Sequence, residues 1–132
     1  IESFNFRMSE GQLLENFVIS ELEKRRKLGF IKADQFYYYK SAAGREIDLI
    51  FESENVLHAI EIKTSRSPSA RDISNLKEFV KQAAGPAPTG AATRGTTTMG
   101  SAKGYLFYLG EEYSEIDGIK LIPLFSLFGG RG

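Results

Sequence analysis

The stretch that decides the fold is Gly44–Phe51, GREIDLIF, which is followed after a short polar link by Ala59–Ser65, AIEIKTS. Both runs are rich in β-branched and apolar residues, which is typical of buried strands. The link Glu52–Asn55 is short enough to predict an antiparallel hairpin. We therefore expect adjacent strands over 45–52 and 56–64, and both carry charge where charge is costly unless a partner uses it.

Strand alternation places these charged residues on defined faces. Successive side chains of a strand point to opposite sides, so Glu61 and Lys63 stand side by side. On the preceding strand, alternation predicts one face with Glu46, Asp48 and Ile50 and an opposite face with Ile47, Leu49 and Phe51. If the hairpin pairs as its apolar residues require, the carboxylates of Asp48 and Glu61 converge.

Two carboxylates beside a lysine suit the hydrolysis of phosphodiesters. A hard divalent cation held by one or two carboxylates activates water and offsets phosphate charge, so we expect Mg²⁺ or Mn²⁺ bound by Asp48 and Glu61. The backbone carbonyl of Ile62 is a further candidate ligand. Lys63 is expected to orient the attacking water or to stabilise the charge that develops. Zinc is a poor candidate, because the chain has no cysteine and a single histidine.

A third acid comes from the first predicted helix, over 9–28. Ser9 followed by Gln12 has the form of a capping box. Apolar residues then recur at helical spacing, namely Leu13, Leu14, Phe17, Val18 and Leu22. Glu15 lies at the border of this apolar face, so it is expected to lean toward the sheet and assist the metal or its water. The alternative is an ordinary surface or capping acid.

The remaining pattern completes an α/β fold. The sequence predicts strands over 35–40, 103–109 and 118–122 and a second helix over 69–82, which Ser69 caps. The strand after this helix is expected to return parallel to the Glu61 strand. The expected architecture is a mixed β-sheet flanked by α-helices.

The order of helix acid, strand Asp, strand Glu-x-Lys and helix resembles the PD-(D/E)XK nuclease superfamily. The resemblance implies a restriction-endonuclease-like sheet and a catalytic set of Glu15, Asp48, Glu61 and Lys63. More narrowly, four stretches are similar to the C-terminal domain that follows an AAA-type ATPase module in many prokaryotic proteins, a family uncharacterised in many members: Gly11–Val18, Tyr37–Lys40, Gly44–Asp48 and Lys103–Gly110. This implies an AAA-type ATPase partner, whose module the chain lacks.

Length and composition predict a single domain over 1–132. With 42% hydrophobic residues the chain can bury a substantial core. The segment 83–102 contains no Leu, Ile, Val, Phe, Tyr or Trp, so it predicts a flexible low-complexity insertion. As a long hinge, it also raises the prospect of a homodimer formed by domain swapping.

The charge balance makes any contact with nucleic acid a local one. Seventeen basic and seventeen acidic residues cancel, so no global field attracts DNA. The local candidates are the basic run 24–27 and the residues Lys63, Arg66 and Arg71. No apolar run approaches the length of a membrane span and no secretory signal is present, so we expect no membrane association and a cytoplasmic location.

Three classes of function remain open on the sequence. The first is a magnesium- or manganese-dependent DNA endonuclease that uses the residues named above. The second is a non-catalytic nucleic-acid- or partner-binding module of an AAA-type ATPase, in which Lys63 forms only a structural ion pair with an acid. The third is a structural or oligomerisation domain that associates through exposed strands and the apolar tail Leu121–Phe128.

Overall fold

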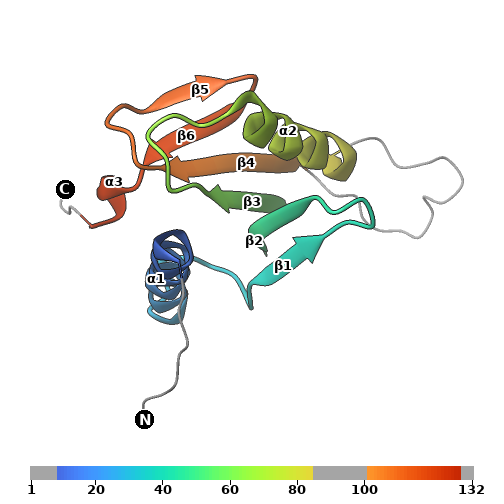
Figure 1. Ribbon diagram of the computed structural model, residues 1–132. Coiled ribbons are helices and arrows are strands. Elements are labelled where there is room, and N and C mark those ends of the chain that lie inside the picture. The colour runs from blue at the N-terminus through green and yellow to red at the C-terminus, as the bar shows by residue number, and fades with distance from the viewer. Residues whose placement is uncertain (1–8, 85–100, 129–132) are drawn as a thin grey trace, which may run out of the picture.

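The computed structural model describes residues 9–84 and 101–128, in which one mixed sheet separates helices on its two sides (Figure 1). In chain order the elements are α1 (Glu10–Lys27), β1 (Tyr37–Lys40), β2 (Glu46–Ser53), β3 (Val56–Ile62), α2 (Ala70–Ala84), β4 (Ser101–Tyr108), β5 (Ser114–Ile116), β6 (Ile119–Pro123) and α3 (Phe125–Phe128). The sheet of these described residues has six strands, in the order β1-β2-β3-β4-β6-β5. The predicted α/β class is therefore confirmed.

The sheet combines antiparallel and parallel pairing, as the sequence predicts. β1, β2 and β3 form an antiparallel meander, and β2 pairs with β3 in a register that sets Leu49 opposite Ile60. After α2 the chain returns in β4 parallel to β3, and β6 pairs parallel with β4. β5 closes the second edge, antiparallel to β6.

Each face of the sheet packs against its own helix. The core on the α2 side is made by Ile47, Ile50, Ala59, Ile73, Leu76, Leu106, Tyr108, Ile119 and Leu121. The core on the α1 side is made by Val18, Leu22, Leu49, Phe51, Ile60, Ile62, Phe107 and Leu124. Figure 1 shows α1 and α2 on opposite sides of the sheet. Residues at the end of β3 therefore lie within reach of both helices.

α1 begins at the predicted cap, but its buried stripe is narrower than predicted. The Ser9 hydroxyl accepts a hydrogen bond from the Gln12 amide at 3.0 Å. Val18 and Leu22 are buried, whereas Leu13 and Phe17 are about half exposed. Leu13 and Phe17 therefore follow the helical period without joining the core. Glu15 precedes Val18 and Leu22 by three and seven positions, which places it on the helix face that meets the sheet.

A β-bulge in β2 breaks the predicted alternation. Tyr37 lies opposite Ile50 and Tyr39 opposite Ile47, so Asp48 and Leu49 together face the single residue between the two tyrosines. Ile47 therefore packs on the α2 side with Ile50, whereas Leu49 packs on the α1 side. Our expectation that Ile47 shares a face with Leu49 was wrong, because strict alternation assumes a strand without an extra residue.

Several boundaries differ from those predicted. Ala83 and Ala84 belong to α2 and Ser101 begins β4, so the segment 83–102 is not wholly a loop; residues 85–100, where the predicted insertion and hinge fall, lie outside the described residues. β5 and α3 were not predicted. No helix of the described part of the chain is long and apolar enough to cross a membrane.

The predicted apolar tail is largely part of the domain's own core. Leu121 lies in β6 and Leu124 directly follows this strand, and they are 3% and 2% exposed. Phe125, in α3, is 57% exposed. Association of copies through the whole of Leu121–Phe128 would therefore require unpacking this core.

Candidate active site

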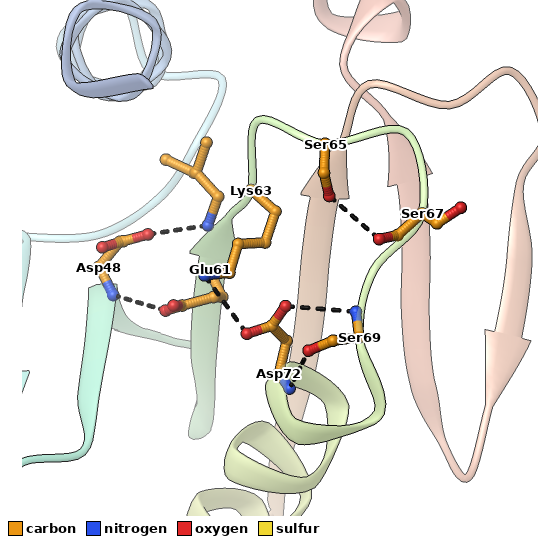
Figure 2. Close-up of polar contacts among 8 residues, drawn as sticks. Asp48, Glu61, Lys63, Ser65, Ser67, Ser69 and Asp72 are labelled. Carbon is orange, nitrogen blue, oxygen red and sulfur yellow. Dashed lines mark hydrogen bonds and ion pairs between the residues drawn. The ribbon is translucent and has the colours of Figure 1, made fainter. Parts of the chain in front are cut away.

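The candidate site lies where the ladder between β2 and β3 gives way to side-chain hydrogen bonds. Backbone pairing extends to Leu49 opposite Ile60. Beyond this pair the Asp48 amide donates to Glu61 Oε1 at 3.2 Å, and the Ile62 amide donates to Asp48 Oδ2 at 2.8 Å (Figure 2). Each carboxyl group thus takes the place of a backbone acceptor on the neighbouring strand. The two predicted metal ligands lie together, and their positions are fixed by the backbone.

The bulge explains how Asp48 reaches this position. An extra residue in one strand re-aims the side chains at that point and increases the local twist. Asp48 occupies the bulge in β2, and Glu15 of α1 lies near enough to raise the pKa of its carboxyl group. α1 therefore brings the third predicted acid to the site. The charge of Glu15 acts on Glu61 as well.

Burial and crowding raise the pKa values of both strand acids. Burial, the hydrogen bond with Glu15 and the charge of Glu61 raise the pKa of Asp48 to about 9, against the lowering effect of the Ile62 amide. Burial raises the pKa of Glu61 to about 7, although the Asp48 amide and the charge of Lys63 act in the opposite direction. Because neighbouring, partly buried carboxyl groups are costly to ionise together, the cluster favours a proton or a cation beside it.

Lys63 lies beside these acids but pairs with a different one. Its Nζ is 3.3 Å from Oδ1 of Asp72 in the first turn of α2. Asp72 was not among the predicted site residues. The signal in the sequence was Ser69-x-x-Asp72, a capping pattern that turns the Asp72 side chain back toward the loop that follows β3. The outcome that Lys63 pairs with an acid was one of the alternatives the sequence left open.

Tyr38 is a second residue near the site that sequence analysis did not assign to it. It lies opposite the bulge, and its side chain is 59% exposed. Partial desolvation, the charge of Glu46 and a hydrogen bond with it, and the charges of Asp48 and Glu15 raise the pKa of its phenol. Tyr37 is exposed as well, so the tyrosine run is not a strand covered on both faces.

The donor set suits a hard divalent cation. Asp48 and Glu61 offer carboxylate oxygens, and the Ile62 peptide lies at the same point because its amide binds Asp48. The only histidine, His58, points elsewhere and hydrogen-bonds with the Tyr105 hydroxyl at 2.9 Å. Within 9–84 and 101–128, however, no group of three or more His, Cys, Asp or Glu side chains is arranged to hold a metal ion. The residues fit Mg²⁺ or Mn²⁺, which need only one or two carboxylates.

The basic residues expected to contact DNA are partly engaged elsewhere. Arg25 bonds to Glu21 and to the Leu127 carbonyl, and Arg26 bonds to Glu23 and to the Asp34 carbonyl. These contacts tie α1 to the loop before β1 and to α3. Arg66 and Arg71, by contrast, are exposed in and just after the loop that follows β3. Within the described residues these two arginines therefore leave their charge open to solvent near the site.

A cavity on the α1 side of the sheet is separate from the acids. Its volume is about 490 Å³, and its wall includes Phe51, His58 and Tyr105 on the α1 side of the sheet. Neither Asp48 nor Glu61 lines it. The candidate acids and this cavity therefore lie in different places. We base the site on the acids, because a mostly apolar cavity offers no carboxylate cluster.

Comparison with known proteins identifies the family. A family model described as a domain of unknown function, DUF4143, matches residues 10–127. The chain belongs to the DUF4143 family. No curated protein matches it. The match spans α1 through most of α3, so it includes every residue of the candidate site in this DUF4143 domain.

Proposed function

We propose that this DUF4143 domain is a divalent-metal-dependent nuclease that cleaves phosphodiester bonds of DNA. The observation that carries the proposal is the pair of half-buried acids at the open end of the β2–β3 ladder. Asp48 and Glu61 each accept a backbone amide from the opposite strand, and both have pKa values raised by burial. Neighbouring acids whose ionisation is disfavoured by burial favour a cation between them.

Each residue of the cluster has a defined role in this proposal. Asp48 and Glu61, with the Ile62 carbonyl, hold Mg²⁺ or Mn²⁺. When bound, the cation lowers the pKa of a water and offsets the charge of the phosphate. Lys63 orients the attacking water or stabilises the developing charge, since its ammonium lies beside Glu61 (Figure 2). Glu15 approaches Asp48 from α1 and assists the metal or its water.

The arrangement of elements supports the resemblance to the PD-(D/E)XK nucleases. The acids come from a helix and two adjacent strands of one mixed sheet, and the lysine follows Glu61 by two residues, directly after the end of β3. Membership of the DUF4143 family does not indicate which activity the chain has, because the family has no functional description. A fold of this kind also hosts unrelated activities, so the proposal depends on the site.

A nuclease assay with matched variants tests the proposal. The chain is incubated with plasmid, single-stranded and branched DNA in Mn²⁺ and then in Mg²⁺. Asp48→Asn and Lys63→Ala should each lower the cleavage rate about 100-fold or more, as expected for groups at the reacting centre. Glu52→Gln is the matched control, because Glu52 is an exposed acid of the same strand. Cleavage that persists in Lys63→Ala, or calorimetry that shows no Mn²⁺ binding dependent on Asp48, contradicts the proposal.

A second candidate is a non-catalytic nucleic-acid- or partner-binding module. The observation in its favour is that the described residues offer no cluster of three potential metal ligands. The partner we propose is an AAA-type ATPase, since DUF4143 domains often occur with such ATPases. DNA binding that weakens with salt but survives Asp48→Asn, together with no cleavage, would favour this module over the enzyme.

The proposal also covers the location and the oligomeric state of the nuclease. We propose that it acts in the cytoplasm, where DNA and an ATPase partner are both present. Cleavage of both strands of a duplex needs two sites, so a homodimer is the expected active form. An exchange of strands between the two copies through the segment 83–102 would involve residues outside the described part of the chain.

A further inference from the structure

The ammonium of Lys63 is shared between the candidate site and the second helix. Its Nζ lies 3.3 Å from Asp72 Oδ1, and 36% of the Lys63 side chain and 17% of the Asp72 side chain are exposed. The charges of both residues act on Glu61, in opposite directions. Figure 2 shows the Lys63 side chain with its ion pair directed to Asp72, beside Glu61. The ammonium therefore lies at the junction of β3 and α2.

Asp72 is itself held in place by the cap of α2. Its Oδ2 accepts a hydrogen bond from the Ser69 amide at 3.3 Å, and the Ser69 hydroxyl accepts one from the Asp72 amide at 3.1 Å. These reciprocal bonds form a capping box, which fixes the first turn. The next residues of the helix anchor it to the sheet, because Ile73 is 8% exposed and Leu76 is fully buried. Asp72 thus presents a carboxylate of fixed position.

Lys63 depends on this contact for a fixed position of its own. A lysine side chain is long and flexible, and its charge prefers water unless a partner holds it. Within the described residues Lys63 forms an ion pair with Asp72 and with no other acid. Its own strand has ended at Ile62, and its amide donates to the Phe107 carbonyl. The backbone is fixed by β4, and the head of the side chain by α2.

We infer that Asp72 is a positioning residue, which holds the Lys63 ammonium beside Glu61 for the reaction. The inference rests on the proposed function, because the place of this ammonium matters only if Glu61 belongs to a metal-dependent site. Without Asp72, Lys63 is free to turn into water or to pair directly with Glu61. Direct pairing would compete with a cation for the Glu61 carboxylate.

The alternative is that Asp72 is only a helix cap, and Ser69→Ala separates the two roles. This variant removes the hydroxyl that accepts from the Asp72 amide but leaves the contact between carboxylate and ammonium. Asp72→Asn keeps an acceptor for the Ser69 amide and removes the charge that holds Lys63. Asp72→Glu keeps the charge. A capping role predicts that Ser69→Ala is the more harmful change, and a positioning role predicts that Asp72→Asn is.

The first experiment is a double-mutant cycle that combines Asp72→Asn with Lys63→Met. The affinity for Mn²⁺ is measured in each variant from the loss of the free Mn²⁺ signal in electron paramagnetic resonance. Asp72→Asn should weaken Mn²⁺ binding about fivefold in the native chain and less than about twofold in the Lys63→Met background. Ser69→Ala should leave affinity within about twofold. Equal weakening by Asp72→Asn in both backgrounds would mean that its charge acts on the metal without Lys63, and would overturn the inference.

The cleavage kinetics provide a second readout. Asp72→Asn should lower kcat about tenfold with KM changed less than about twofold, as expected when a catalytic group is misplaced while substrate still binds. Asp72→Glu should recover part of kcat. A loss of kcat in Ser69→Ala equal to that in Asp72→Asn would assign the effect to the helix cap and contradict the positioning role.

The inference and the proposed function can fail separately. If the native chain neither binds Mn²⁺ nor cleaves DNA, the nuclease proposal fails, and the same cycle is then measured by urea unfolding. A coupling of about two- to fivefold in the unfolding equilibrium constant between positions 63 and 72 still supports a fixed ammonium. Independent effects of the two changes on unfolding would overturn it whatever the activity.

Discussion

Replacing Asp48 by Asn should make the metal-free domain more stable at neutral pH while it removes the proposed activity. In the folded chain the pKa of Asp48 is raised from an ordinary value of 3.8 to about 9, first by burial and then by the hydrogen bond with Glu15. At pH 7 the unfolded chain has an ionised Asp48, so folding must take up a proton or bury a charge. An asparagine is neutral in both states. Its carbonyl can accept from the Ile62 amide, and its amide can donate to Glu15.

The sign and size follow from proton linkage. A carboxyl group whose folded pKa is raised contributes no penalty below its unfolded pKa, and the penalty grows as the pH rises from about 4 toward 9. Neutral pH lies about three pH units above the ordinary value of Asp48, and each unit corresponds to ~1.4 kcal/mol, which gives an upper bound of roughly 4 kcal/mol. The actual penalty is smaller than this bound, because the Asp48 carboxyl group is partly exposed and the protein around it can relax. We expect Asp48→Asn to gain about 1–3 kcal/mol at pH 7.

Urea unfolding in the presence of a chelator measures this difference. Free energies of unfolding are compared for the native chain and Asp48→Asn at about pH 4.5 and pH 8, with Glu52→Gln as an exposed control on the same strand. The gain should be larger at pH 8 and should shrink toward zero at the acidic end. A difference in stability that is the same at both pH values would show that folding leaves the pKa of Asp48 unshifted, and would refute the reasoning.

Three further predictions address the core and the α1 side of the sheet. Gly104→Ala should lower stability by about 1–3 kcal/mol in thermal or urea unfolding, since a Cβ there would lie 2.7 Å from Cδ1 of the buried Ile119; a stability within error of the native value would show that Ile119 can shift. Leu76→Ala should cost about 2–5 kcal/mol by the same measurement, because Leu76 is fully buried between α2 and the sheet; a loss below ~1 kcal/mol would contradict that packing. Burial lowers the pKa of His58, so its contribution is complete above the ordinary value of 6.5 and is lost as the pH falls below it. His58→Gln should flatten the decline in stability between about pH 6.5 and 5, and an unchanged decline would mean that other groups cause it.

The sequence predicted the fold where local patterns decide it. The caps at Ser9 and Ser69 and the β2–β3 hairpin were visible as short-range signals, and the structure has all three. The helix face of α1 was less reliable, because Leu13 and Phe17 satisfy the helical period and yet are about half exposed. Periodicity shows which residues share a face, whereas the width of the buried stripe depends on how much sheet the helix covers.

The site was predictable in its residues but not in its geometry. Residue types and spacing single out Asp48, Glu61 and Lys63, which the structure brings together. The bulge that aims Asp48 results from pairing between β1 and β2, and no glycine or proline marks it in β2. The partner of Lys63 is equally non-local, since it comes from a helix whose docking the sequence does not specify. The catalytic roles of these residues stay predictions.

The extra residue in β2 makes the site sensitive to chain length as well as to residue identity. Deletion of Leu49, or insertion of one residue beside Tyr38, would let β1 and β2 pair without interruption. Asp48 would then lose its place in the bulge, while every acid and the lysine remained in the chain. A relative that has all the motif residues but one residue more or fewer here would therefore lack the assembled site. An alignment that ignores this gap would not reveal the difference.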